Sequence, residues 1–203
     1  MNDEMGILKE VGSIASGQGS IALSELMGRR INLVVPNLEV VESGQVLKKL
    51  AKEQIVVCVF CRILTGIEGK ILFLLDEKST YKLVDMCYKI TQEDKKSGIF
   101  TEMGLSLLKE VGNVVISSFV GALSMILKTI IIPSIPTLVN GPADQILSMA
   151  VSSKEDYVLF IDTLFEEPQQ KISGCFYLIL DPNTAKHIQE SCKKLLESIS
   201  KDE

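Results

Sequence analysis

Residues 6–39 read GILKEVGSIASGQGSIALSELMGRRINLVVPNLE, and residues 106–139 read SLLKEVGNVVISSFVGALSMILKTIIIPSIPTLV. The two stretches align without a gap at an offset of 100 positions and share the pentapeptide LKEVG. Their ends repeat too, because ILFLLDEKSTYKLVDMC at 71–87 resembles FYLILDPNTAKHIQESC at 176–192. A repeat of this extent predicts two similar halves, which we place at residues 1–97 and 98–203.

Each half has the same predicted order of elements, αβββα. Apolar residues recur at three- to five-residue spacing over 101–129, which indicates a long amphipathic helix, and its counterpart spans 4–28. A strand follows at 31–40 and at 131–140, each with a proline, which an edge strand tolerates. Two β-rich runs then predict a hairpin, and a closing helix completes each half.

We therefore expect an α+β fold, an α/β sandwich in which long helices pack on a mixed, mostly antiparallel sheet. Strands and helices do not alternate singly, so a doubly wound parallel sheet is disfavoured. The polar stretch TQEDKKSG at 91–98 is the expected linker between halves related by a pseudo-twofold axis. Each half has too little core to stand alone, so the 203 residues are expected to form one pseudo-symmetric domain.

Composition excludes several functions. The net charge is −5 and there is no basic block, which argues against a nucleic-acid partner. Cys58 and Cys61 form a C-x-x-C, but they lie in an apparent strand whose alternation puts them on opposite faces, so we expect buried thiols and no metal site. The longest apolar stretch is interrupted by polar residues, so we expect a soluble, cytoplasmic chain with no membrane insertion.

The second long helix carries a polar group of residues. Glu110 and Asn113 are three apart and share a helix face, with Ser106 one turn earlier. Such a pair taken alone is typical of a solvated face. Gly112 lies between them, and a glycine inside a helix predicts close approach by a neighbouring backbone or a partner protein.

Ser106-x3-Glu110-x2-Asn113-x22-Pro136 matches the Asp/Ser-x3-Glu-x2-Asn-x22-Pro signature of the CheC/CheX/FliY family of chemotaxis phosphatases. The duplicated chain resembles the CheC type of that family most. The resemblance implies an α/β sandwich of two related halves. It also implies that the chain removes the phosphoryl group from the phosphoaspartate of a CheY-type response regulator.

The resemblance also implies a role for each signature residue. Asn113 positions the attacking water, because a side-chain amide can accept one hydrogen bond and donate another. Glu110 docks the partner, most simply through its active-site lysine, while Ser106 supports the site and Pro136 shapes the adjacent strand. The receiver supplies Mg²⁺, so no cofactor is expected on this chain.

The first half has Gly6, Glu10, Ser13 and Pro36 at the same four offsets. Glutamate and proline are kept, but serine replaces the amide and has no NH₂ group to donate. We expect a degenerate site that can dock a partner without turnover.

Two alternatives stay open. The chain could be a non-enzymatic adaptor that binds the deamidase CheD, or a phospho-CheY-dependent regulator of CheD, neither of which needs Asn113. It could also be a flagellar-switch component, although no added switch domain is evident. The internal pseudo-dimer favours a monomer.

Overall fold

A computed structural model describes residues 2–43, 45, 54–87, 102–153, 156–167 and 170–199. The predicted linker at 91–98 and the boundary between the halves lie outside these residues. The described elements are α1 (Asn2–Met27), β1 (Asn32–Glu42), β2 (Ile55–Thr65), β3 (Gly69–Asp76), α3 (Glu77–Cys87), α5 (Glu102–Leu127), β4 (Ile132–Pro133), β5 (Thr137–Pro142), α6 (Ala143–Ala150), β6 (Tyr157–Glu167), β7 (Gln170–Leu180) and α7 (Pro182–Ile199).

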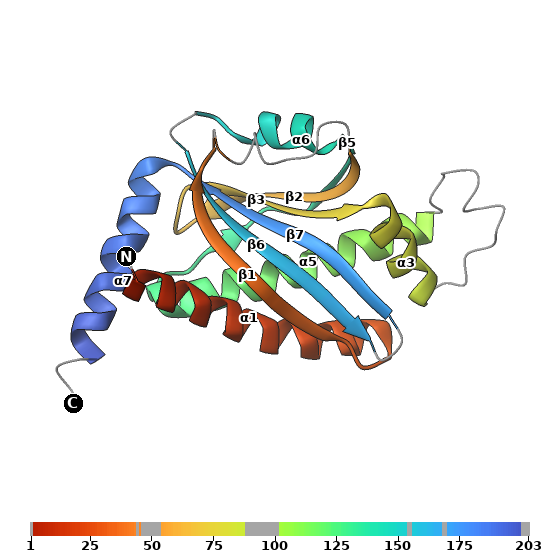
Figure 1. Ribbon diagram of the computed structural model, residues 1–203, viewed down its shortest axis with the longest axis horizontal. Helices are drawn as coiled ribbons and strands as arrows, with labels where there is room; N and C mark the ends of the chain where they lie inside the picture. Colours follow the sequence, from red (N-terminus) through yellow and green to blue (C-terminus); the bar gives the residue numbers. More distant parts are fainter. Residues whose placement is uncertain are drawn as a thin grey trace.

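The seven strands form one sheet in the order β1-β6-β7-β3-β2-β4, and β5 also pairs with β2. Every described strand pair is antiparallel, which confirms the α+β class and the mostly antiparallel sheet. The helices α1 and α5 run antiparallel to each other and cover one face, while α6 covers the other (Figure 1).

The strands of the two halves interleave in this sheet. Each strand of the first half corresponds to one of the second: β1 to the β4–β5 pair, β2 to β6, and β3 to β7. When each is replaced by its counterpart, the sheet has the same order read from the opposite edge. At the centre β3 pairs with β7, and Leu72 lies opposite Tyr177, its counterpart at the 105-residue offset between the ends of the halves. This order fits the predicted internal duplication about a pseudo-twofold axis between β3 and β7, and the duplication itself stays a prediction.

The second half departs from the predicted αβββα order in two places. The strand expected at 131–140 is split into β4 and β5, because residues 134–136, the last of which is Pro136, are not part of any strand. An additional short helix, α6, follows β5 and was not predicted. Its buried side chains, which include Ile146 and Leu147, cover apolar residues of the outer sheet face, which would otherwise meet water.

The two thiols of the C-x-x-C lie on opposite faces of β2, as predicted. Cys58 belongs to the core beneath α6, and Cys61 belongs to the core between the sheet and the long helices. Burial, with a smaller contribution from Cys61, raises the pKa of the Cys58 thiol to about 12, and burial raises the pKa of Cys61 to about 11. Both thiols therefore stay protonated near neutral pH and pack as small apolar side chains.

Candidate functional site

Three of the four signature residues share one stripe of α5. Ser106 and Glu110 are exposed and Asn113 is half-buried, while the opposite side of the helix is buried against the sheet and α1. Their spacing of four and then three residues places them on successive turns of one face. The fold therefore presents a carboxylate and an amide side by side toward the solvent.

The stripe is held in place from behind by Gly112. A Cβ atom at this position would lie 2.4 Å from Cγ2 of Val59 on β2, so only glycine lets the helix come this close to the strand. The close approach predicted from the glycine is confirmed, but the neighbour is a side chain of the sheet and not the backbone or partner protein that was expected. Gly112 lies between Glu110 and Asn113 along the helix. Its contact with Val59 therefore sets how far both side chains stand from the sheet.

The side chains of Glu110 and Asn113 are available to a partner. Within the described part of the chain, neither makes a hydrogen bond or an ion pair with another side chain. An amide held on a helix with its carbonyl and NH₂ groups unused can accept a hydrogen bond from a water molecule and donate one to a ligand. The stripe is thus equipped to orient a water molecule.

Pro136, the fourth signature residue, lies in the break between β4 and β5. The break stays attached to β2, because the Ser134 amide donates to the Arg62 carbonyl at 2.7 Å and the Arg62 amide donates to Ser134 Oγ at 3.0 Å. Two residues after Pro136, Leu138 pairs with Val59, the valine that packs on Gly112. Pro136 is therefore placed at the sheet edge alongside α5, one strand away from the valine that contacts the helix.

The first-half counterparts keep a similar frame. Glu10 and Ser13 are exposed on α1, and Pro36 is exposed within a bulge of the edge strand β1. Ser13 and Pro36 line the same open cavity, of about 620 Å³, together with Lys9. Gly6, the remaining counterpart, lies within α1. The first half therefore retains a hollow where its degenerate site is expected.

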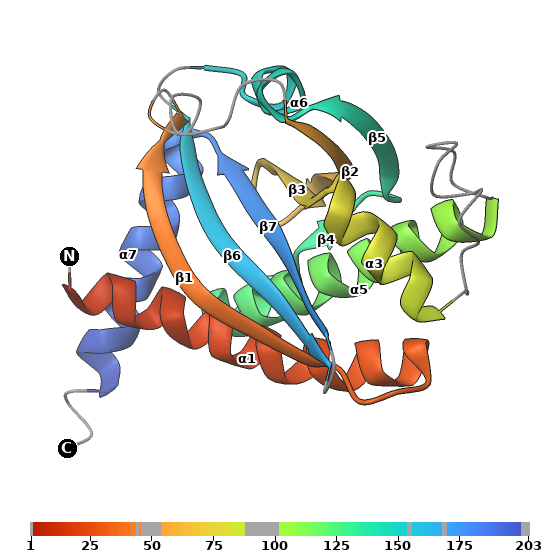
Figure 2. The ribbon, with the colours of Figure 1, turned by 45° about the vertical axis from the view of Figure 1, so that its right-hand side comes forward.

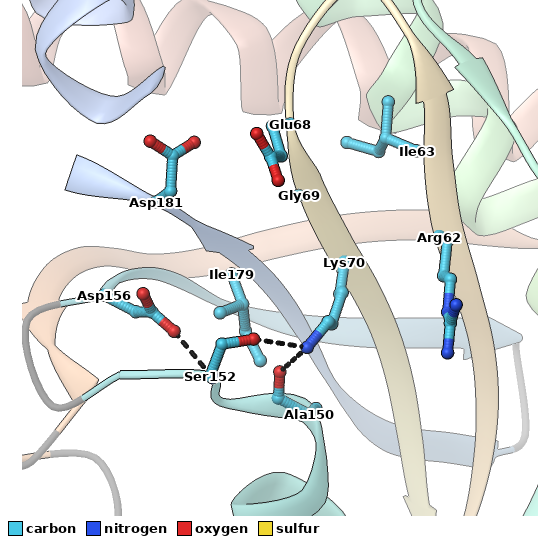
Figure 3. Close-up of a pocket in the computed structure, with 10 residues that line it drawn as sticks. All are labelled: Arg62, Ile63, Glu68, Gly69, Lys70, Ala150, Ser152, Asp156, Ile179 and Asp181. Carbon is cyan, nitrogen blue, oxygen red and sulfur yellow. Dashed lines mark hydrogen bonds between the residues drawn. The ribbon is translucent and has the colours of Figure 1, made fainter. Parts of the chain in front are cut away.

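A separate polar pocket of about 420 Å³ lies between the β2–β3 hairpin and the C-terminal end of α6 (Figure 3). Lys70 Nζ donates to the Ala150 carbonyl at 2.6 Å and to Ser152 Oγ at 2.8 Å. A lysine at a helix C-terminus satisfies a free carbonyl and complements the helix dipole. Lys70 thus secures α6 to the sheet, and this contact could not be predicted from the sequence because α6 itself is too short to predict.

Among the described residues, no group of three or more His, Cys, Asp or Glu side chains is placed to hold a metal ion. One helix, α5, is long and apolar enough by length and composition to cross a membrane, but half of its most apolar window is buried inside the fold. There it packs against α1 and the sheet, as a core helix does.

Comparisons with known proteins support the resemblance drawn from the signature. A sequence model of the CheC-like family matches residues 103–139, which include all four signature residues. The CheY-P phosphatase CheC of Bacillus subtilis is 23% identical over 185 residues, covering 88% of each chain. The crystal structure of Thermotoga maritima FliY is 25% identical, with a TM-score of 0.74 over 96% of this chain and 98% of that one.

The same fold occurs in a solved structure of lower sequence identity. The FliM middle domain of H. pylori is 12% identical and superposes with a TM-score of 0.65 over 92% of this chain and 98% of that one. At this identity the likeness shows the fold alone, so any activity must be argued from the residues on α5. The signature, the family model over residues 103–139 and the matches to relatives agree, and each of them is a similarity to CheC-like proteins.

Proposed function

We propose that the chain hydrolyses the phosphoaspartate of a phosphorylated CheY-type response regulator. One observation carries the proposal. Asn113 is an amide with no hydrogen-bond partner among the described residues, and it lies one turn from an exposed Glu110 on a helix fixed by close packing. The curated relative named a CheY-P phosphatase supplies the class of substrate.

The reaction asks little of this chain. Water attacks phosphorus in line with the bond to the aspartyl oxygen, that bond breaks, and inorganic phosphate leaves while the carboxylate is restored. The water's protons pass to phosphate and solvent. The receiver's own Mg²⁺ and lysine offset charge on the phosphoryl oxygens. In this scheme Asn113 holds the water in line, which lowers the barrier by orientation.

The other signature residues act through placement. Glu110 pairs with the receiver's lysine and so brings Asn113 over the phosphoryl group. Ser106, one turn earlier, extends the same exposed stripe and contacts the receiver or supports the site. Pro136 ends the break at the sheet edge and shapes the surface beside the helix. This chain contributes no metal of its own, and it works as a cytoplasmic monomer.

The first half takes a lesser part in this proposal. Glu10 and Ser13 keep an exposed position on α1, but Ser13 cannot both accept from water and donate an NH₂ hydrogen. The first half therefore binds a partner without turnover. A role as an adaptor for CheD is the alternative, and it does not depend on Asn113.

The test is the loss of phosphate from a phosphorylated CheY-type receiver in the presence of Mg²⁺. Wild type is expected to accelerate it, Asn113→Ala to return it to the receiver's own rate, and Ser13→Ala to behave as wild type. Equal activity of wild type and Asn113→Ala would remove the amide from the mechanism. No acceleration by wild type with any plausible receiver would favour the adaptor role.

A further inference from the structure

The segment after each long helix alternates between buried and exposed residues. In the first half Arg30 and Asn32 are exposed and Ile31 between them is buried. In the second half Ile130 and Ile132 are 75% and 47% exposed, while Ile131 is 6% exposed. The inward residue is isoleucine in both halves, so the packing is kept. The outward residues are polar in the first half and aliphatic in the second half, which is the half that has Asn113.

Ile135 adds a third exposed aliphatic side chain. Its counterpart Val35 packs over α1, with Cγ1 3.4 Å from where a Cβ atom on Gly12 would lie. Ile135 has left the corresponding position, where Val59 packs on Gly112 instead, and it is 86% exposed. We call Ile130, Ile132 and Ile135 the isoleucine patch.

The isoleucine patch lies on the segment that follows α5, the helix that carries the candidate site. The segment that carries it turns back over α5 at β4, and β5 then rises away from the helix toward α6 (Figure 2). Ile131 lines a small apolar space with Val120 of α5, so the segment packs directly on that helix. Leu138 pairs with Val59, the residue that packs on Gly112. Ile135 is three residues before Leu138, and three residues span at most about 10 Å. A domain-sized partner placed over Asn113 therefore meets Ile135, and a contact that extends toward the C-terminal end of α5 meets Ile132 and Ile130.

Folding does not require isoleucine at these positions, because the first half forms the same turn and inward contact with Arg30 and Asn32. Neighbouring exposed aliphatic side chains are unfavourable in water and mark interaction surfaces. Three side chains are too few to form the interface of roughly 800 Å² per subunit that a stable dimer needs. They suit a partner that binds and leaves at each turnover.

We infer that the isoleucine patch is the apolar part of the docking surface for the phosphorylated receiver domain, and that it directs the receiver to the second half. This inference rests on the function proposed above. It adds that docking has two components, with Glu110 contributing charge and the patch contributing apolar contact. The first half, with Arg30 and Asn32 in place of two isoleucines, lacks the second component.

The test gives the second half the residues of the first. Binding of the full chain to a CheY-type receiver held in its beryllofluoride-activated form with Mg²⁺ is measured for wild type, for Ile130→Arg/Ile132→Asn and for Ile135→Ser. Each variant is expected to bind about tenfold more weakly, with KM raised and kcat unchanged, since the lost contact is present before and during reaction. Met149→Ser is the matched control, because Met149 is 79% exposed on α6, on the other face of the sheet.

The outcomes separate this inference from the proposed function. If wild type hydrolyses the receiver and both patch variants bind the receiver as tightly as wild type does, the docking role is overturned and the proposed phosphatase activity stands. Variants that abolish self-association in light scattering, with receiver affinity unchanged, would assign the patch to a second copy of the chain. A wild-type chain that neither binds nor hydrolyses any receiver would overturn both. Circular dichroism and thermal unfolding confirm that the variants fold.

Discussion

The two long helices finish alike but differ in what covers their middle. In α1 the hydroxyl of Ser24 accepts a hydrogen bond from the Ile31 amide at 2.9 Å, and in α5 Ser124 accepts one from Ile131 at 3.2 Å. These pairs occupy the same positions at the 100-residue offset. The helix ends have thus kept one hydrogen-bonded turn in both halves, because that turn connects each helix to the strand that follows it.

The middle of each helix has changed. Gly12 faces Val35 of its own half with ordinary room, whereas Gly112 is pressed against Val59 from the other half. In the first half the edge strand stays continuous through a bulge, and in the second it breaks before Pro136. The halves therefore agree at the hydrogen-bonded turn after each long helix, and they differ in the strand that packs on the middle of each helix and in the course of the edge strand.

The largest expected effect concerns the two glutamates. Glu110→Gln is expected to lower kcat/KM for phosphoryl hydrolysis by about 100-fold, because removing one member of a docked charge pair leaves the receiver's lysine without its partner. Glu10→Gln should change kcat/KM less than about twofold, since the first half lacks both an amide and the isoleucine patch. Steady-state phosphate release over a range of receiver concentrations measures both variants. Equal losses would mean that the halves dock the receiver equally.

The two central glycines give the next contrast. Gly112→Ala should lower the free energy of unfolding by about 1–2 kcal/mol, since the clash with Val59 outweighs the better helix propensity of alanine. Gly12→Ala should raise the free energy of unfolding by up to about 1 kcal/mol. Alanine has the better helix propensity, and its methyl group would lie 3.4 Å from Val35, which is ordinary contact and no clash. Urea unfolding at equilibrium measures both.

A second-site change tests the cause. Val59→Ala in the Gly112→Ala background should recover part of the loss by opening room for the new Cβ atom. If the double variant is instead less stable by the sum of the two single effects, the contact between helix and strand is not the origin of the loss.

A smaller effect is expected from restoring the missing amide. Ser13→Asn in the Asn113→Ala background places an asparagine three residues after Glu10, at the mouth of the cavity that Ser13 and Pro36 line. Hydrolysis should rise only a few-fold above the Asn113→Ala chain, because the first half keeps Glu10 but lacks the apolar docking component. The single variant Asn113→Ala is the reference for this measurement. Recovery to the wild-type rate would show that the first half lacks nothing but the amide.

Most of the fold could be predicted because the chain repeats its own pattern. The ungapped alignment at an offset of 100 identified both long helices and their edge strands, and β-branched runs identified both hairpins. The split of the strand before Pro136 could not be read from the sequence, since a proline also fits within an edge strand, as Pro36 does in β1. Helix α6 was missed because its eight residues give too short a periodic pattern.

Spacing predicted that three signature residues share a helix face, because residues three and four apart lie on one side of a helix, but only the resemblance to the family signature marked that face as a candidate site. Helical spacing placed Ser106, Glu110 and Asn113 together, and the structure has them on one stripe. The isoleucine patch could not be found in this way. Ile130, Ile131 and Ile132 are identical letters, and only the packing of the segment on α5 shows which of them faces outward.

The smallest predicted effect tests whether the two helix ends are equivalent. The residue after each helix has a left-handed backbone, with φ of 61° at Gly28 and 51° at Lys128. A lysine in this region carries a steric penalty that glycine avoids, so Lys128→Gly should raise the free energy of unfolding by about 0.5–1 kcal/mol. Gly28→Lys should lower it by a similar amount. Urea midpoints compare the two, and opposite shifts of similar size indicate that the turns are interchangeable. A neutral Lys128→Gly would instead show that the second turn has adapted to its lysine, and that the halves have diverged at their ends as well as at their sites.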